Sequence, residues 1–209
     1  MSQPRVVVVG LGAMGAAAAF HLSRRGAAVI GLEARAPGHR QGASHGQSRI
    51  IRKAYYEDPC YVPLVLRAYD LWRELEQASG EPLLELTGGL MIGPPDGEVV
   101  AGSSASARQW GIDHRLLTAR EIHHEFPQLA PERDDAGLFE PEAGALAPEA
   151  AVLAHLGQAA ARGAQLHFGE PVEAWEPRGE ELLVHSSAAQ YRADRLVLAA
   201  GAWTPSLLA

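Results

Sequence analysis

Three glycines and one acidic residue near the start of the chain have the types and spacing needed to hold a phosphorylated nucleotide. Gly10, Gly12 and Gly15 are spaced as G-x-G-x-x-G, and Glu33 follows 23 residues after Gly10. Gly10 allows a tight turn, Gly12 has no side chain to keep a pyrophosphate from the backbone, and Gly15 lets a helix pack closely on a strand. The N–H groups at the start of that helix attract phosphate. A glutamate at this distance accepts a hydrogen bond from a ribose hydroxyl. The pattern predicts a dinucleotide site.

The segment at residues 36–50 carries a second set of side chains suited to ligand binding. It is rich in Gly, Ser and polar residues, it contains His45 and Arg49, and Arg52 lies just beyond it. Arginine binds carboxylate or phosphate through paired hydrogen bonds and stacks on flat rings. Because this loop follows the second predicted strand, we expect these side chains near the carboxyl edge of the sheet, where ligands bind. Composition alone leaves open a simple solvated loop.

The elements that would position these residues alternate between strand and helix. Uniformly apolar, β-branched residues predict a buried strand at 6–9. A helix at 16–25 and a strand at 28–32 follow. Later helices are expected at 63–78, 98–110 and 148–162, with a short one begun by a capping box at Thr118. Later strands are expected at 84–92 (with a Gly88-Gly89 interruption), 165–168, 172–176, 182–185 and 195–199.

This order predicts an α/β fold with interleaved domains. The chain begins with a β-α-β unit, continues with a segment of mixed helices and strands, and then has another helix followed by strands. We therefore expect a Rossmann-like nucleotide-binding domain at 1–82 and 146–209, interrupted by part of an α+β domain at 83–145. A simple NAD dehydrogenase would continue the β-α-β series without this excursion.

Composition excludes several classes of protein. The 209 residues are 47% hydrophobic with a net charge of −7, so there is no basic footprint for nucleic acid. No apolar stretch reaches membrane-span length, and the start runs directly into the first strand without a signal peptide. The single cysteine, Cys60, cannot form an internal disulfide, and no histidine cluster suggests a metal. We expect a cytoplasmic protein without metal, nucleic-acid or membrane partners.

Several motifs together make the chain resemble the monomeric sarcosine oxidase family, which includes N-methyltryptophan oxidase and other FAD-dependent amine oxidases of the D-amino-acid-oxidase superfamily. The most specific is GASHGQSRIIR at residues 42–52. The others are the glycine motif with Glu33, YVPL at 61–64, LW at 71–72, TGGL at 87–90, EPEAG at 140–144 and AAGAW at 199–203. The resemblance spans essentially the whole chain.

The resemblance implies a D-amino-acid-oxidase fold in which FAD lies extended, with the 83–145 segment as part of a substrate domain. Arg49 would lie against the flavin ring, Arg52 would hold the substrate carboxylate, and His45 would line the flavin region. These three are the implied catalytic residues. The implied cofactor-binding residues are Gly10, Leu11, Gly12, Ala13, Met14, Gly15, Glu33, Ala34, Arg35, Ser44, His45, Ser48, Arg49, Val172, Ala200, Gly201 and Trp203.

The implied reaction is oxidation of a secondary amine, such as an N-methyl amino acid, to an imine, with oxygen reduced to hydrogen peroxide. FAD carries the redox chemistry while the protein orients the substrate. The implied partners are thus a small amine substrate and oxygen, and the protein is expected to be a monomer.

The chain also departs from the family pattern. Family members run further and supply a lysine near the flavin and a cysteine that links to FAD. Neither is carried over here, because Cys60 does not match the linking position. We expect the chain to be the N-terminal half of such an enzyme, with little oxidase activity alone.

Two alternatives remain open at this point. The glycine motif also resembles the start of NAD(P)-dependent dehydrogenases, although these lack the loop at 42–52. A non-catalytic chain that binds FAD or another nucleotide is the second alternative.

Overall fold

The computed structural model describes residues 3–208, which divide into two compact units. The first unit holds the described residues up to Gln47, the segment Leu75–Leu83, and the described residues from Ala147 onward. The second unit holds Ser48–Glu74 and Leu84–Leu146. Residues 48–74, which the sequence grouped with the nucleotide-binding domain, therefore fall in the same unit as most of the 83–145 segment. The functional assignment of the domains stays a prediction.

The first unit is built on a parallel sheet in the order β13-β1-β2-β9. Its strands are β1 (Arg5–Val9), β2 (Ala28–Glu33), β9 (Gln165–Phe168) and β13 (Arg195–Leu198). Helix α1 (Ala13–Arg24) connects β1 to β2, and α5 (Pro148–Ala160) precedes β9. The predicted β-α-β start and the returning helix and strand are confirmed.

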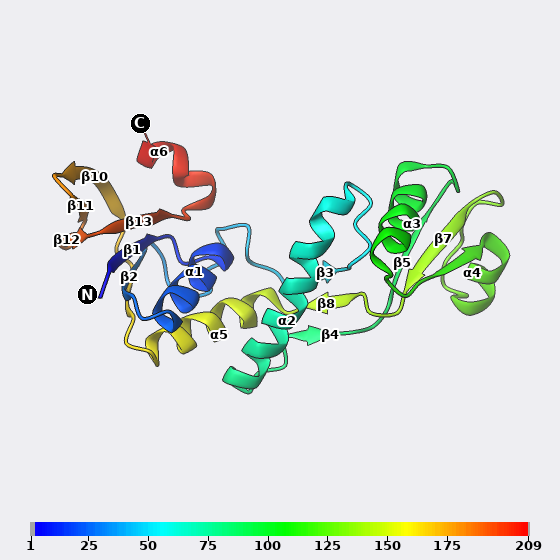
Figure 1. Cartoon of the computed structure of the whole chain (residues 1–209), viewed down its shortest axis with the longest axis horizontal. Helices are drawn as coiled ribbons and strands as arrows, with labels where there is room; N and C mark the ends of the chain where they lie inside the picture. The colour runs from blue at the N-terminus through cyan, green and yellow to red at the C-terminus, as the bar shows by residue number, and fades with distance from the viewer. Residues whose placement is uncertain (1–2, 209) are drawn as a thin grey trace. The chain divides into compact units, whose positions relative to one another are not determined.

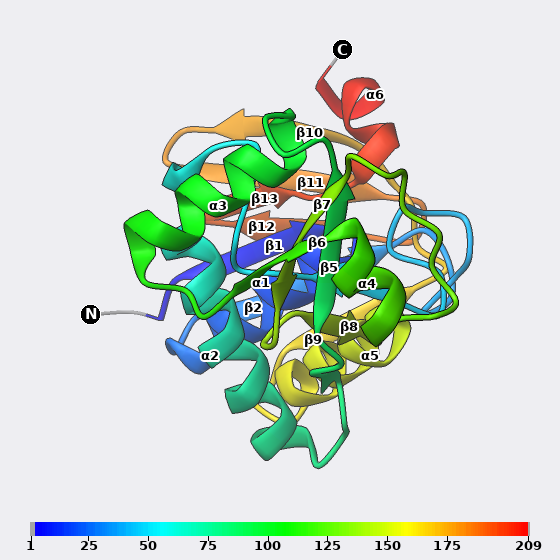
Figure 2. The same cartoon turned by 90° about the vertical axis from the view of Figure 1, so that its right-hand side faces the viewer.

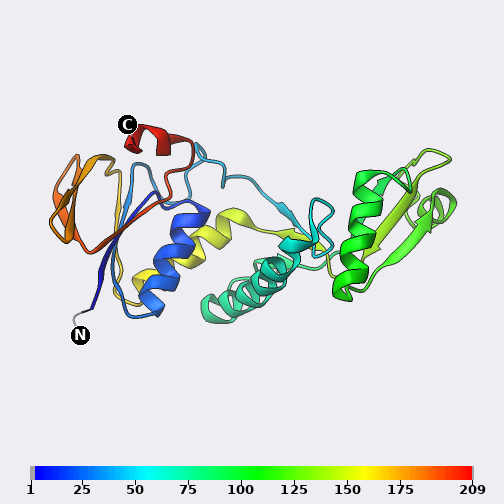
Figure 3. The ribbon, with the colours of Figure 1, turned by 45° about the horizontal axis from the view of Figure 1, so that its top comes forward.

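A three-stranded antiparallel sheet completes the first unit. It consists of β10 (Val172–Arg178), β11 (Glu181–Ser186) and β12 (Gln190–Ala193). The 3-10 helix η2 (Gly201–Trp203) and α6 (Thr204–Leu208) follow β13. Figures 1 and 3 show the parallel sheet between this second sheet and the helix pair α1 and α5.

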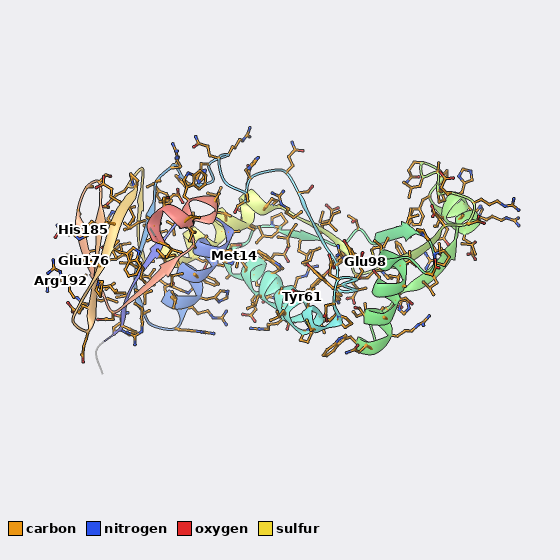
Figure 4. All side chains as sticks on the ribbon, turned by 90° about the horizontal axis from the view of Figure 1, so that it is seen from above. Met14, Tyr61, Glu98, Glu176, His185 and Arg192 are labelled. Atoms are coloured by element: carbon orange, nitrogen blue, oxygen red, sulfur yellow. The ribbon has the colours of Figure 1, made fainter. Side chains whose placement is uncertain are left out.

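The core of the first unit lies between its two sheets. Strand residues alternate between faces, so Val7 and Val9 point to the same side and pack with Leu32, Val184 and Ala193. Glu176, His185 and Arg192 lie on the opposite face of the β10–β12 sheet, outside this core (Figure 4). On the other side of the parallel sheet, α1 packs against α5, with the rings of Phe20 and His155 in edge contact.

The second unit contains two small sheets. One has the order β3-β8-β4, from Arg49–Ile51, Gly144–Leu146 and Leu84–Glu85. The other has the order β5-β7-β6, from Gly89–Gly93, Ala136–Glu140 and Arg115–Thr118. Helices α3 (Glu98–Trp110) and α4 (Ala119–Glu125) accompany the second sheet, as Figure 2 shows. Ala107 of α3 packs with Leu138 of β7. The short helix η1 (Pro59–Tyr61) leads into α2 (Val62–Ser79), whose residues belong partly to each unit.

Local predictions in this region are mostly confirmed. The Thr118 side chain and Glu121 form the expected capping box of α4. The strand predicted at 84–92 is wrong as a single element, because the chain turns at Gly88, where φ is +75°, and separates β4 from β5. The loop predicted at 36–50 ends in strand β3, which pairs with β8. Cys60 is exposed, and its hydrogen bond with Asp58 raises the pKa of the thiol.

Within residues 3–208 no helix combines the length and apolar character needed to cross a membrane.

Candidate cofactor site

Strand register brings the glycine motif, Glu33 and the end of β13 to the same edge of the parallel sheet. Val9 pairs with Leu32 on one side and with Leu198 on the other. The next residue of each strand is therefore Gly10, Glu33 or Ala199. Because all three strands are parallel, these residues lie at the carboxyl edge, where this class of sheet binds ligands.

The three glycines have the separate structural roles expected from their spacing. Gly10 has φ of +86°, and a Cβ there would lie 2.6 Å from the Ala199 carbonyl oxygen. A Cβ on Gly15 would lie only 1.7 Å from the Gly10 carbonyl oxygen. Among residues 3–208, apart from its chain neighbours, a Cβ on Gly12 would meet only Ser44 Oγ within 4 Å, at 3.2 Å. Gly10 and Gly15 are thus required by the fold, whereas a Cβ on Gly12 would press on a side-chain hydroxyl and on no backbone atom given within residues 3–208.

Glu33 is held in place by backbone donors from two directions. The Leu11 N–H donates to Glu33 Oε2 at 2.8 Å, and the Arg35 N–H donates to Oε1 at 3.0 Å. The side chain belongs to a buried residue, only 7% exposed. A buried carboxylate needs such hydrogen bonds to remain charged. The glycine loop and the acidic residue therefore form one connected structure.

The Ser44 side chain caps the N-terminus of α1. The N-cap residue Gly12 has no side chain to cap the helix, and Ser44 Oγ accepts a 2.9 Å hydrogen bond from the Ala13 N–H. A hydroxyl that accepts one hydrogen bond can still donate its own proton. Ser44 is thus placed to donate to an anion bound at this helix end.

A cavity of about 500 Å³ opens at this edge of the first unit. This volume is in the range of small-molecule sites. It is lined by twelve of the predicted cofactor residues, namely Gly10, Gly12, Ala13, Met14, Glu33, Ala34, Arg35, Ser44, Val172, Ala200, Gly201 and Trp203. Met14 is 79% exposed at the start of α1 (Figure 4). Leu11 and Gly15 are buried and do not line this cavity.

The turn before β10 is hydrogen-bonded to Glu33, the last residue of β2. The Glu170 N–H donates to the Glu33 carbonyl oxygen at 2.9 Å. The Glu170 carboxylate accepts hydrogen bonds from the Ser186 and Tyr191 hydroxyls, which lower its pKa. Val172, the next strand's first residue, is thereby held at the cavity.

The second predicted set of residues is divided between the two units. His45 belongs to the first unit; its ring is exposed and Nδ1 contacts the Gly42 carbonyl oxygen. It does not line the 500 Å³ cavity. Ser48, Arg49 and Arg52 belong to the second unit. Their cofactor and substrate roles stay predictions.

Arg52 has a well-defined environment in the second unit. Its Nη2 donates to both carboxylate oxygens of Glu57, at 2.7 and 2.8 Å. The guanidinium lies 4.7 Å from the ring centre of Tyr55 and 4.8 Å from that of Tyr56. Its Nε–H is buried and finds no hydrogen-bond acceptor among residues 3–208. Desolvation alone would raise the pKa of the Glu57 carboxyl, but hydrogen bonds from Arg52 keep it below its usual value.

Buried Glu140 supports the backbone next to Arg52. Its two carboxylate oxygens accept hydrogen bonds from the Lys53 N–H at 2.7 Å and the Ala54 N–H at 2.9 Å. The side chain is fully buried. Arg49, on β3, donates from Nη1 to the Ser48 carbonyl oxygen at 2.8 Å.

Several cavity residues were not predicted from the sequence. The strand ends Val9 and Leu32 line it, as do His39, Gln41 and Pro171. The strand ends could have been found from the rule that ligands meet the carboxyl edge. His39 and Gln41 lie in the loop after Glu33, where composition indicated only a polar segment.

The fold and site together define a class of protein: a Rossmann-like α/β protein with a cavity at the carboxyl edge of its parallel sheet. FAD fits the groups present, since Gly12, Ala13 at the α1 N-terminus and buried Glu33 all line the cavity. Comparison with known proteins agrees. The family described as "FAD dependent oxidoreductase" matches residues 5–209, and the chain belongs to this family. Its cofactor is FAD.

Two groups of relatives match nearly the whole of this chain. Monomeric sarcosine oxidase of Streptomyces avermitilis is 51% identical over 203 residues, which are 97% of this chain and 53% of that protein. N-methyl-L-tryptophan oxidase of Citrobacter koseri is 34% identical, over 97% of this chain and 55% of that protein. The chain thus spans about half the length of these relatives.

Solved structures show the same fold. The open form of NikD, an unusual amino acid oxidase essential for nikkomycin biosynthesis, has a TM-score of 0.88 at 30% identity, covering 100% of this chain and 54% of that one. Glycine oxidase from Geobacillus kaustophilus has a TM-score of 0.82 at 24% identity, over 98% of this chain and 58% of that chain. The predicted fold class and the resemblance to sarcosine oxidases are confirmed.

Proposed function

We propose that this chain serves the FAD-dependent oxidation of a secondary amine of the N-methyl amino acid type to an imine, with oxygen reduced to hydrogen peroxide. The observation that carries the proposal is the cavity formed by the glycine loop, buried Glu33 and the α1 N-terminus, in a chain 51% identical to a sarcosine oxidase. When bound, FAD supplies the two-electron chemistry.

In this proposal the first unit binds the adenosine diphosphate portion of FAD. Glu33 accepts a hydrogen bond from a ribose hydroxyl. The Gly12 backbone, the α1 N-terminus and the Ser44 hydroxyl bind the pyrophosphate. Each of these groups lies at the cavity in the first unit. Binding of this portion therefore needs no residue of the second unit.

Arg52 is our candidate for the substrate carboxylate. Two features support this assignment: its guanidinium is already paired with a carboxylate, that of Glu57, and its buried Nε–H still lacks an acceptor within residues 3–208. Stacking on Tyr55 and Tyr56 keeps the guanidinium in place. Arg49 and His45 are proposed at the flavin and its pyrophosphate, and a monomer is proposed in solution.

The test combines binding with turnover. The purified 209-residue chain is mixed with FAD, passed through a desalting column and examined for flavin absorbance, and peroxide is then measured with sarcosine and with N-methyltryptophan. We expect FAD to stay with the protein and the chain alone to produce little peroxide. Retention of NAD or NADP in place of FAD would refute the cofactor assignment.

A second candidate function is FAD binding without turnover. The observation that favours it is that the groups assigned to the adenosine diphosphate portion of FAD all lie in the first unit, whereas Arg49 and Arg52 belong to the second. The two candidates are separated by a chimera that joins residues 1–209 to the remaining sequence of the Streptomyces avermitilis relative. Peroxide formation from sarcosine by this chimera supports the oxidase. FAD binding with no amine oxidised supports the second candidate.

A further inference from the structure

His39 lies beside the ribose-binding carboxylate but belongs to none of the motifs that identify the site. Its side chain is 19% exposed, and its Nε2 lies 3.5 Å from Glu33 Oε1. The residue lines the 500 Å³ cavity and also a smaller one of about 30 Å³ beside Glu33. It therefore borders the place where a ribose would meet Glu33.

A backbone hydrogen bond fixes which nitrogen of His39 carries the proton. The Gln41 N–H donates to His39 Nδ1 at 3.2 Å. A nitrogen that accepts a hydrogen bond has no proton of its own, so the proton of the neutral ring is on Nε2. The Nε2–H is the atom nearest Glu33, and its partial positive charge attracts the carboxylate.

The donors around Glu33 are distributed unequally between its two oxygens. Oε1 faces the Arg35 N–H and His39 Nε2, whereas Oε2 accepts, within the described part of the chain, only from the Leu11 N–H. A carboxylate oxygen has two lone pairs. Oε2 therefore keeps one lone pair for a ligand hydroxyl, while His39 and Arg35 hold Oε1.

We propose that His39 is a positioning residue for Glu33: its Nε2–H holds Oε1, so that Oε2 is presented to a ribose hydroxyl of the nucleotide. The inference rests on the proposed function, because it concerns the same nucleotide site. It adds a residue that acts through Glu33 and does not itself need to touch the ligand.

Two substitutions separate the two contacts of the ring, the hydrogen bond from the Gln41 N–H and the 3.5 Å approach of Nε2 to Glu33. Asparagine places an acceptor near the position of Nδ1, so His39→Asn keeps the bond to Gln41 but loses the donor to Glu33. Glutamine places an N–H near the position of Nε2, so His39→Gln keeps that donor. Calorimetric titration with ADP measures the nucleotide portion alone. The exposed His124 on α4 provides the control His124→Gln.

We expect His39→Gln to bind ADP within about twofold of the unsubstituted chain and His39→Asn to bind about three- to tenfold more weakly. In a Glu33→Gln background, His39→Asn should not weaken ADP binding further. Two residues that act through each other have non-additive effects on the binding free energy. Equal thermal unfolding midpoints for His39→Gln and His39→Asn show that both variants are folded.

Three results would overturn the proposal. They are normal ADP affinity in His39→Asn, weaker binding in His39→Gln than in His39→Asn, and a His39→Asn effect that persists in the Glu33→Gln background. A measurement without ligand is independent of the proposed function: the ring ¹⁵N shifts of His39 should show a proton on Nε2, and a proton on Nδ1 would refute the arrangement. Failure of the unsubstituted chain to bind ADP or FAD would count against the proposed function, while the ¹⁵N shifts still decide the His39–Glu33 relationship.

Discussion

The backbone N–H of Leu11 donates a 2.8 Å hydrogen bond to Glu33 Oε2, which joins the middle of the glycine motif to the acidic end of the next strand. The two residues are 22 positions apart in sequence. Their contact follows from the register of β1 and β2, in which Val9 pairs with Leu32. The glycine loop and the Glu33 carboxylate therefore hold each other in place.

Replacing Glu33 by glutamine should weaken FAD and ADP binding by about 10- to 100-fold, as expected for loss of a charge-assisted hydrogen bond worth about 1.5–3 kcal/mol. The amide NH₂ would also face one of the two backbone donors that now reach the carboxylate. Titration calorimetry measures the change. Glu98→Gln, at the exposed start of α3 (Figure 4), is the matched control. Unchanged affinity in Glu33→Gln would remove this residue from the site.

The glycines Gly12 and Gly15 should respond differently to the same substitution. Gly15→Ala places a Cβ 1.7 Å from the Gly10 carbonyl oxygen, so it should lower the thermal unfolding midpoint and abolish FAD binding. In Gly12→Ala the new Cβ meets only Ser44 Oγ, at 3.2 Å, so the fold should persist while FAD binding is lost. Thermal unfolding and flavin absorbance measured together distinguish the two. Normal FAD content in Gly12→Ala would contradict close approach of a pyrophosphate.

His155 should make stability depend on pH between about 4 and 6.5. Burial lowers the pKa of His155 to about 4, while its Nδ1–H donates to the Ala151 carbonyl oxygen. Between the folded and unfolded pKa values the unfolded chain binds a proton that the folded chain does not. The free energy of unfolding should therefore rise with pH through this window, by about 2–3 kcal/mol at most.

Urea unfolding at pH values from 4 to 8 measures this dependence. His155→Leu should flatten the slope between pH 4 and 6.5, whereas the exposed His124→Leu should leave it unchanged. An equal slope in the unsubstituted chain and in His155→Leu would show that another group is responsible.

Arg52→Ala, made in the chimera with the Streptomyces avermitilis relative, should raise the KM for carboxylate-bearing amines much more than it changes FAD content. Loss of a bidentate charged contact corresponds to about 1.5–3 kcal/mol of binding, or roughly 10- to 100-fold in KM. Glu57→Gln tests the partner that now pairs with this guanidinium. Loss of FAD from Arg52→Ala would instead assign Arg52 to the cofactor site.

Sequence reasoning succeeded where a residue's role depends on near neighbours in the chain. The turn at Gly10, the close packing of Gly15 and the capping box at Thr118 are all local, and each is present. Strands β6 and β12 were not predicted, because both contain charged and polar residues and their inward residues are identified only by the partner strand.

Other parts of the site depend on contacts that no local pattern encodes. The bond between Ser44 Oγ and the Ala13 N–H spans 31 positions, and the bonds from Lys53 and Ala54 to Glu140 span 87 and 86. His39 was missed because its role depends on the Gln41 turn, which sets the position of its proton. Arg49 and Arg52 were expected from a motif, but their pairing with other residues could be seen only in the folded unit.

The most direct test of this account is a calorimetric titration of the 209-residue chain with FAD, followed by the same titration in the presence of ADP. We predict saturable binding at one site, competition by ADP, and loss of both in Gly12→Ala with the fold retained. Absence of FAD binding by a folded chain, or binding that ADP does not compete with, would contradict the assignment of the cavity at Gly12 and Glu33 as the cofactor site.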